Sequence, residues 1–96
     1  MKILAIVEVA DGAPLPEIRA GLGEELRGSW SLYVAGHLRE VYATETPTRV
    51  VFVLEAASAA EAAAHLDALP LVEAGLFTYA LTELRPFANW SLLFGK

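Results

Sequence analysis

The strongest constraint on the fold of this chain is a pair of apolar runs that contain no polar position. One run covers residues 50–54 (VVFVL), and a second covers residues 3–7 (ILAIV). Successive side chains of a β-strand point to opposite faces of a sheet, so both runs are apolar on both faces. A sheet with two apolar faces is normally covered on both sides. The fold must therefore provide two covers for one sheet.

The rest of the sequence predicts two helices and two further strands around these runs. Apolar residues at spacings of four, four, four and three predict a helix that ends at Gly36. Ser58 and Glu61 form a capping box at the start of a second helix, and Pro70 closes that helix. The expected elements, in order, are strand 2–10, helix 16–36, strands 37–45 and 49–56, helix 58–70 and strand 75–84.

The first helix carries two glycines, Gly21 and Gly23, which each weaken a helix by about 1 kcal/mol relative to alanine. We therefore expect this helix to be irregular before Glu24. Its apolar stripe consists of Ile18, Leu22, Leu26, Trp30 and Tyr33.

The element order βαββαβ predicts an α+β fold of the ferredoxin-like type. Its antiparallel sheet has the strand order 4-1-3-2, with both helices on one face. Residues 1–86 form the single domain, and residues 87–96 form an apolar C-terminal arm. The helix-free face of the sheet is apolar too, so we expect a homodimer that packs through these faces. The arm contains an apolar cluster that marks a contact with the partner or with a neighbouring dimer.

Composition excludes several classes of protein. The 96 residues include no cysteine, which removes disulfides and thiolate chemistry and is compatible with a cytoplasmic protein. A net charge of -5 without a cluster of Lys or Arg argues against nucleic acid as a partner. No apolar stretch approaches the ~20 residues of a spanning helix, so no membrane association is expected. The two histidines are 28 positions apart, and we predict neither a metal site nor a cofactor.

Several charged residues are predicted to gather at one end of the sheet. Arg39 and Glu55 share a parity across a three-residue hairpin loop, so they can face each other. Arg39 can bind a substrate carboxylate through its planar fork, while His37 or Glu55 carries a proton. Alternatively, Arg39 and Glu55 neutralise each other, and His37 only closes a turn. The predicted cluster consists of Lys2, His37, Arg39, Glu55, Glu83 and Arg85.

Aromatic residues offer a second set of candidates. Trp30, Tyr33 and Tyr42 can line a pocket for a flat ring, or can belong to the core. Glu8 lies in an apolar strand, where it is either a base with a raised pKa or a side chain near water at the strand end. His65 is expected to be exposed in the middle of its helix.

Three short motifs resemble the muconolactone Δ-isomerase family of the dimeric α/β-barrel superfamily. They are Gly36-His37-Leu38-Arg39, Leu69-Pro70-Leu71 and Arg85-Pro86. The resemblance implies a two-sheet dimer that assembles further into rings. It also implies a double-bond shift in a γ-lactone that bears a carboxylate, by proton abstraction and return without metal or organic cofactor. Arg39 is then the partner of the substrate carboxylate, and no catalytic base is carried over.

The sequence therefore favours cofactor-free proton-transfer isomerisation of a small lactone or enol-type acid. His37 and Glu55 are the candidate proton carriers, and Arg39, Trp30, Tyr33 and Tyr42 are the candidate binding residues. One alternative is a cofactor-independent monooxygenase of the same barrel superfamily that acts on an aromatic compound. Another is a non-catalytic module for small-molecule binding or assembly.

Overall fold

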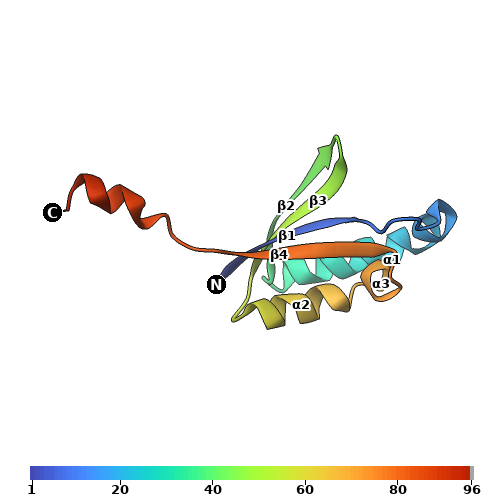
Figure 1. Ribbon diagram of the computed structural model, residues 1–96. Coiled ribbons are helices and arrows are strands. Elements are labelled where there is room, and N and C mark those ends of the chain that lie inside the picture. The colour runs from blue at the N-terminus through green and yellow to red at the C-terminus, as the bar shows by residue number, and fades with distance from the viewer. Residues whose placement is uncertain (96) are drawn as a thin grey trace.

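The computed structural model describes residues 1–95 as one four-stranded antiparallel sheet with its helices gathered on one face (Figure 1). The strand order β2-β3-β1-β4 is the predicted order read from the other edge. The α+β, ferredoxin-like fold class is thus confirmed. The elements are β1 (Lys2–Val9), α1 (Leu15–Val34), β2 (Leu38–Glu45), β3 (Thr48–Glu55), α2 (Ala59–Asp67), α3 (Pro70–Glu73), β4 (Phe77–Leu84) and the 3-10 helix η1 (Ala88–Leu93).

The two central strands place apolar side chains on both faces of the sheet, as their sequences predict. Ile3, Ala5 and Leu54 are completely buried beneath the helices. On the opposite face, Leu4 lies beside Val53 and Ile6 beside Val51, and these side chains are only half-buried. The core is therefore on the helical side, while the other face keeps an apolar centre that no helix covers.

Helix α1 is continuous over 20 residues, so the expected irregularity before Glu24 is wrong. The reason is close packing between α1 and α3. A Cβ atom at Gly21 would lie 2.6 Å from Leu71 Cδ2, and one at Gly28 would lie 2.9 Å from Leu69 Cδ2. Glycine lets the backbone of α1 approach these buried leucines, and this packing offsets its low helix propensity.

Pro70 does not close the second helix, as we expected, but begins another one. Helix α2 ends at Asp67, and Pro70 is the first residue of the short helix α3. The fixed φ of proline suits a first helical position, where the missing N–H would have no partner within the helix. Gly75 follows α3 with φ +77° and ends it in a Schellman motif, because its N–H and that of Leu76 bond back to Val72 and Leu71.

The C-terminal segment leaves the body of the molecule after β4 and ends in η1 (Figure 1). Its large apolar side chains are 64–86% exposed, and they are Phe87, Trp90, Leu92, Leu93 and Phe94. This segment is the predicted apolar arm, of which Lys96 lies outside the described residues. No helix within residues 1–95 is long and apolar enough to span a membrane.

The close approach of α1 to α3 can be tested with two alanine substitutions in the same helix. Gly23→Ala should raise the free energy of unfolding by about 0.5–1 kcal/mol, because a Cβ there meets only the end of the Arg27 side chain. Gly21→Ala should lower it by about 1 kcal/mol, because overpacking against buried Leu71 outweighs the gain in propensity. Urea denaturation measures both values, and equal stabilisation by the two substitutions would contradict this packing.

Candidate functional site

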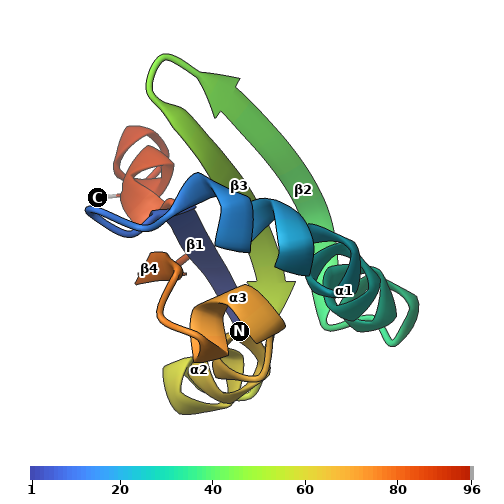
Figure 2. The same ribbon diagram turned by 90° about the vertical axis from the view of Figure 1, so that its right-hand side faces the viewer.

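Helix α1 does not close completely over the sheet, and a cavity of about 350 Å³ lies between them. Figure 2 shows α1 crossing β3 toward β2. The apolar stripe of α1 forms one wall of the cavity, so Leu26 remains 58% exposed. The opposite wall comes from the sheet. The lining residues are Val7, Leu22, Glu25, Leu26, Ser29, Val41, Tyr42, Ala43, Val50, Phe52 and Phe77.

The cavity continues into a shallow surface hollow near the C-terminal end of α1. A depression of about 360 Å³ lies between the two and shares lining residues with both. It is lined by Leu26, Ser29, Trp30, Tyr33, Leu38 and Val41. We call the whole feature the trough. The hollow forms its mouth, which is lined by Trp30, Tyr33, Arg39, Glu40, Val41 and Tyr42.

Glu25 is the only buried charged residue among those described, and it lines the cavity between α1 and the sheet. Its side chain projects from α1 and is 6% exposed. One carboxylate oxygen, Oε1, accepts a hydrogen bond of 2.7 Å from the backbone N–H of Leu71 in α3. Burial raises the pKa of Glu25 above its ordinary value, and the Leu71 hydrogen bond opposes that rise.

A carboxyl group with a raised pKa in an apolar cavity is suited to act as a general acid or base. Glu25 is not among the site residues predicted from the sequence. A signal was available, because Glu25 lies three residues after Leu22 and four before Ser29 and so falls within the apolar stripe of α1. A carboxylate inside an apolar stripe is unusual, whereas its neighbour Glu24 faces solvent and pairs with Arg27.

The four predicted binding residues meet at the mouth of the trough. Arg39, Trp30, Tyr33 and Tyr42 all line the hollow. The rings of Trp30 and Tyr33 stack with their centroids 5.4 Å apart. The hydroxyl of Tyr42 donates a hydrogen bond to Glu40, and this contact raises the pKa of Tyr42. A guanidinium group therefore lies beside three aromatic rings at the entrance to an apolar cavity.

Arg39 and Glu55 do not lie opposite each other in the β2-β3 ladder, contrary to the prediction. Glu45 pairs with Thr48, so the hairpin loop is one residue shorter than expected and the register is shifted. The ladder is also irregular between Leu38 and Glu40, which leaves Arg39 without a partner strand residue. Glu55 instead forms an ion pair with the amino group of Met1, and this ammonium lowers the pKa of Glu55, while the charge of Arg39 still helps to lower it.

The other predicted charges do gather at one end of the sheet. Lys2 lies opposite both Glu55 and Leu84, and the N–H of Glu55 donates a hydrogen bond to the carbonyl of His37.

Glu8 forms an ion pair of 2.8 Å with Arg49 and is exposed. The structure therefore supports the alternative in which Glu8 lies near water.

His37 is not in the trough lining but packs against His65. Their ring centroids are 4.1 Å apart. The expectation that His65 is exposed is wrong, because only 25% of its side chain is accessible. Glu61 lies one turn before His65 on α2, and these three side chains are the group in residues 1–95 that could hold a metal ion.

Comparisons with known proteins identify the fold. No protein-family model matches the chain, and no curated protein matches it in sequence. Among solved structures, it is similar to 5-chloro-2-hydroxyhydroquinone dehydrochlorinase from Burkholderia phenoliruptrix, in complex with 2,5-dihydroxybenzoquinone. The TM-score is 0.71 at 17% sequence identity, and the match covers 93% of this chain and 98% of the dehydrochlorinase. The chain therefore shares the α+β, ferredoxin-like fold of that solved structure.

The burial of Glu25 can be tested through the pH dependence of stability. Because the folded state raises the pKa of Glu25 above 4.5, the native protein loses stability as pH rises through and above that value. Glu25→Gln keeps an oxygen to accept the Leu71 N–H bond but cannot ionise. The free energy of unfolding of the variant minus that of the wild type should increase from about pH 4 and then level off. Parallel pH profiles from urea denaturation would refute the buried, ionising carboxyl.

Proposed function

We propose that the protein is a cofactor-free enzyme that moves a proton between two positions of a small organic acid. The observation that carries this proposal is the buried carboxyl of Glu25 in an apolar trough whose mouth holds Arg39. Arg39 binds the carboxylate of the substrate through its planar fork. The remainder of the substrate then enters the trough between α1 and the sheet.

Glu25 acts as the base and then as the acid of one double-bond shift. Its ionised carboxylate removes a proton from the γ carbon of a lactone whose double bond is conjugated with the carbonyl group, which leaves a dienolate. The protonated carboxyl returns the proton to the carbon next to the carbonyl group, and the double bond moves by one position. No electron or group is exchanged with another molecule. The apolar wall favours this cycle because burial raises the pKa of Glu25 above its ordinary value.

A γ-lactone carrying a carboxylate is the substrate we favour, because the Arg39 motif resembles the muconolactone Δ-isomerases. A hydroxylated aromatic ring is the second candidate. Stacked Trp30 and Tyr33 at the mouth suit a flat ring, and the similar dehydrochlorinase structure contains 2,5-dihydroxybenzoquinone. A hydroxylated aromatic substrate would fit the alternative function, a cofactor-independent monooxygenase. If neither substrate is turned over, the protein is a non-catalytic module for binding or assembly.

We further propose that the protein forms a homodimer through the helix-free face of its sheet. The chain exposes 6683 Å². A compact chain of this size exposes about 5,400 Å². Both the apolar centre of the sheet and the C-terminal arm contribute to this excess. Sheet packing forms the dimer, and the arm, residues 87–96, packs on a neighbouring chain in a higher, ring-like oligomer.

Proton transfer by Glu25 can be measured as solvent exchange with muconolactone as the probe in D₂O. Wild-type protein should incorporate deuterium, and Glu25→Gln should lower the rate at least about 100-fold because it removes the proton carrier. Arg39→Gln should raise KM about 10–100-fold through loss of a charged hydrogen bond. Glu17→Gln, at an exposed position of the same helix, is the control. Equal exchange by Glu25→Gln and the wild type would exclude this role.

The two proposed interfaces can be separated by light scattering. Val51→Glu places a charge in the apolar centre of the sheet and should yield monomers. Deletion of residues 88–96 should leave the dimer intact and remove only larger assemblies. Ala64→Glu, on the exposed side of α2, is the control and should change neither the dimer nor the larger assemblies. A wild-type protein that is monomeric at all concentrations would overturn the assembly proposal without affecting the exchange experiment.

A further inference from the structure

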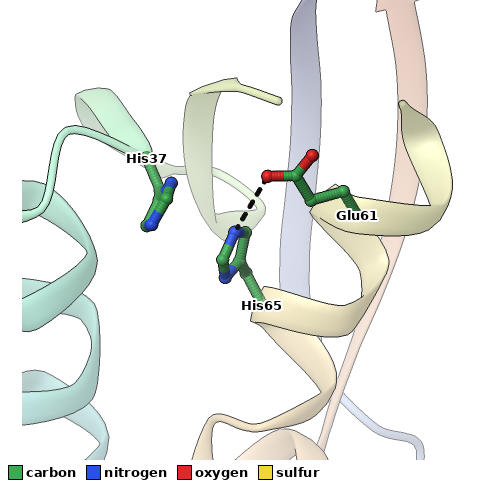
Figure 3. Close-up of side chains that lie close together, drawn as sticks. All are labelled: His37, Glu61 and His65. Atoms are coloured by element: carbon green, nitrogen blue, oxygen red, sulfur yellow. Dashed lines mark ion pairs between the residues drawn. The ribbon is translucent and has the colours of Figure 1, made fainter. Parts of the chain in front are cut away.

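His37, Glu61 and His65 form a second cluster of functional side chains, outside the trough. Their nitrogen and oxygen ligand atoms all lie within 4.8 Å of one another. Figure 3 shows His65 and Glu61 on α2, facing His37 from the segment that follows α1. None of the three residues lines the trough. Whatever this cluster does is therefore separate from the proposed proton transfer.

The backbone holds each of the three side chains at a defined position. His37 follows Gly36, which has φ +87°, and its N–H bonds to the carbonyl of Leu32 in a Schellman motif that ends α1. The carbonyl of His37 accepts the N–H of Glu55 in β3. Glu61 and His65 are four residues apart on α2 and so lie on one face of that helix.

The capping box of α2 orients the carboxylate of Glu61. Oε2 of Glu61 accepts a hydrogen bond of 2.9 Å from the N–H of Ala57, while the hydroxyl of Ser58 accepts from the N–H of Glu61. The other oxygen, Oε1, is left facing Nε2 of His65 at 3.7 Å. Metal-binding carboxylates are commonly held by hydrogen bonds of this kind. The capping box thus presents one oxygen to the cluster.

Nε2 of His65 lacks a partner of its own. It is buried and makes no hydrogen bond with the described residues. The 3.7 Å to Glu61 is too long for a hydrogen bond. A buried polar atom without a hydrogen-bond partner lowers the free energy of unfolding by about 1–3 kcal/mol. In the neutral tautomer that carries its proton on Nδ1, the lone pair of Nε2 is available to bind a metal ion.

We propose that His37, Glu61 and His65 bind a divalent transition-metal ion of the Zn²⁺ type. Two imidazole nitrogens and one carboxylate oxygen are ligands that Zn²⁺ accepts, whereas Mg²⁺ and Ca²⁺ prefer oxygen alone. Tetrahedral ligands at about 2.0–2.1 Å from zinc lie about 3.3 Å apart. The ligand atoms here must close by at most about 1.5 Å, a movement on the scale of side-chain rotation. The bound ion would join the end of α1 to α2.

The site can be tested on tag-free, metal-free protein by titration calorimetry with Zn²⁺. We expect one ion per chain, and at least about 100-fold weaker binding by His65→Gln or Glu61→Gln. Glu61→Gln keeps an oxygen for the Ala57 N–H, so it tests the ligand with the capping bond retained. Glu73→Gln, an exposed glutamate on α3, should bind as the wild type does.

Cobalt provides a readout that does not depend on the variants. The chain contains two histidines and no cysteine, so any imidazole coordination of Co²⁺ must come from this cluster. Binding should produce visible d–d absorption, together with shifted ring-proton signals from both histidines in the NMR spectrum. Histidine signals unchanged by Co²⁺, or unchanged Zn²⁺ affinity in His65→Gln, would overturn the proposal.

Discussion

One hydrogen bond, from the N–H of Leu71 to the carboxylate of Glu25, joins the longest helix to the shortest one. It can form only because α1 approaches α3 closely at Gly21. The same contact buries a carboxyl group next to an apolar cavity, which raises its pKa and makes it useful for proton transfer. Packing, electrostatics and the proposed chemistry thus depend on one helix pair.

The trough exists because α1 covers the sheet incompletely. Strand β2 is exposed along nearly its whole length, and the stripe of α1 that would normally seal it leaves Trp30 and Tyr33 accessible. An apolar stripe that is not sealed within one chain either binds a ligand or meets another chain. In this fold the open side of the stripe lies between Arg39 and Glu40 of β2 at the mouth and the buried Glu25 of α1.

Much of the fold could be predicted from the sequence. The apolar runs around Ile6 and Phe52 predict the central strands, and the element order predicts the sheet topology. The register of the hairpin could not be predicted, because the sequence around Pro47 allows a loop of two or three residues. The choice between these two lengths shifts every pairing of β2 with β3 by one position. The role of Gly21 was also hidden, since its low helix propensity is visible in sequence while its contact with Leu71 is not.

The candidate site was predicted only in part. The residues at the mouth could be predicted because charged and aromatic side chains near the ends of helices and strands are common in binding sites. They are Arg39, Trp30, Tyr33 and Tyr42. Glu25 was not predicted, because its burial depends on the contact of α1 with Leu71 in α3, which the sequence does not show. The spacing of Glu61 and His65 was visible, but their approach to His37 depends on how α1 and α2 pack side by side.

The central claim is that Glu25 titrates as a buried carboxyl group inside the trough. The most direct measurement is the carboxyl ¹³C chemical shift of Glu25 as a function of pH, assigned by comparison with Glu25→Gln. We expect a titration midpoint above the ordinary value of 4.5, because burial disfavours the charged form of Glu25. A midpoint at or below 4.5 would contradict the claim, because the carboxyl would then be as well solvated as one on the surface.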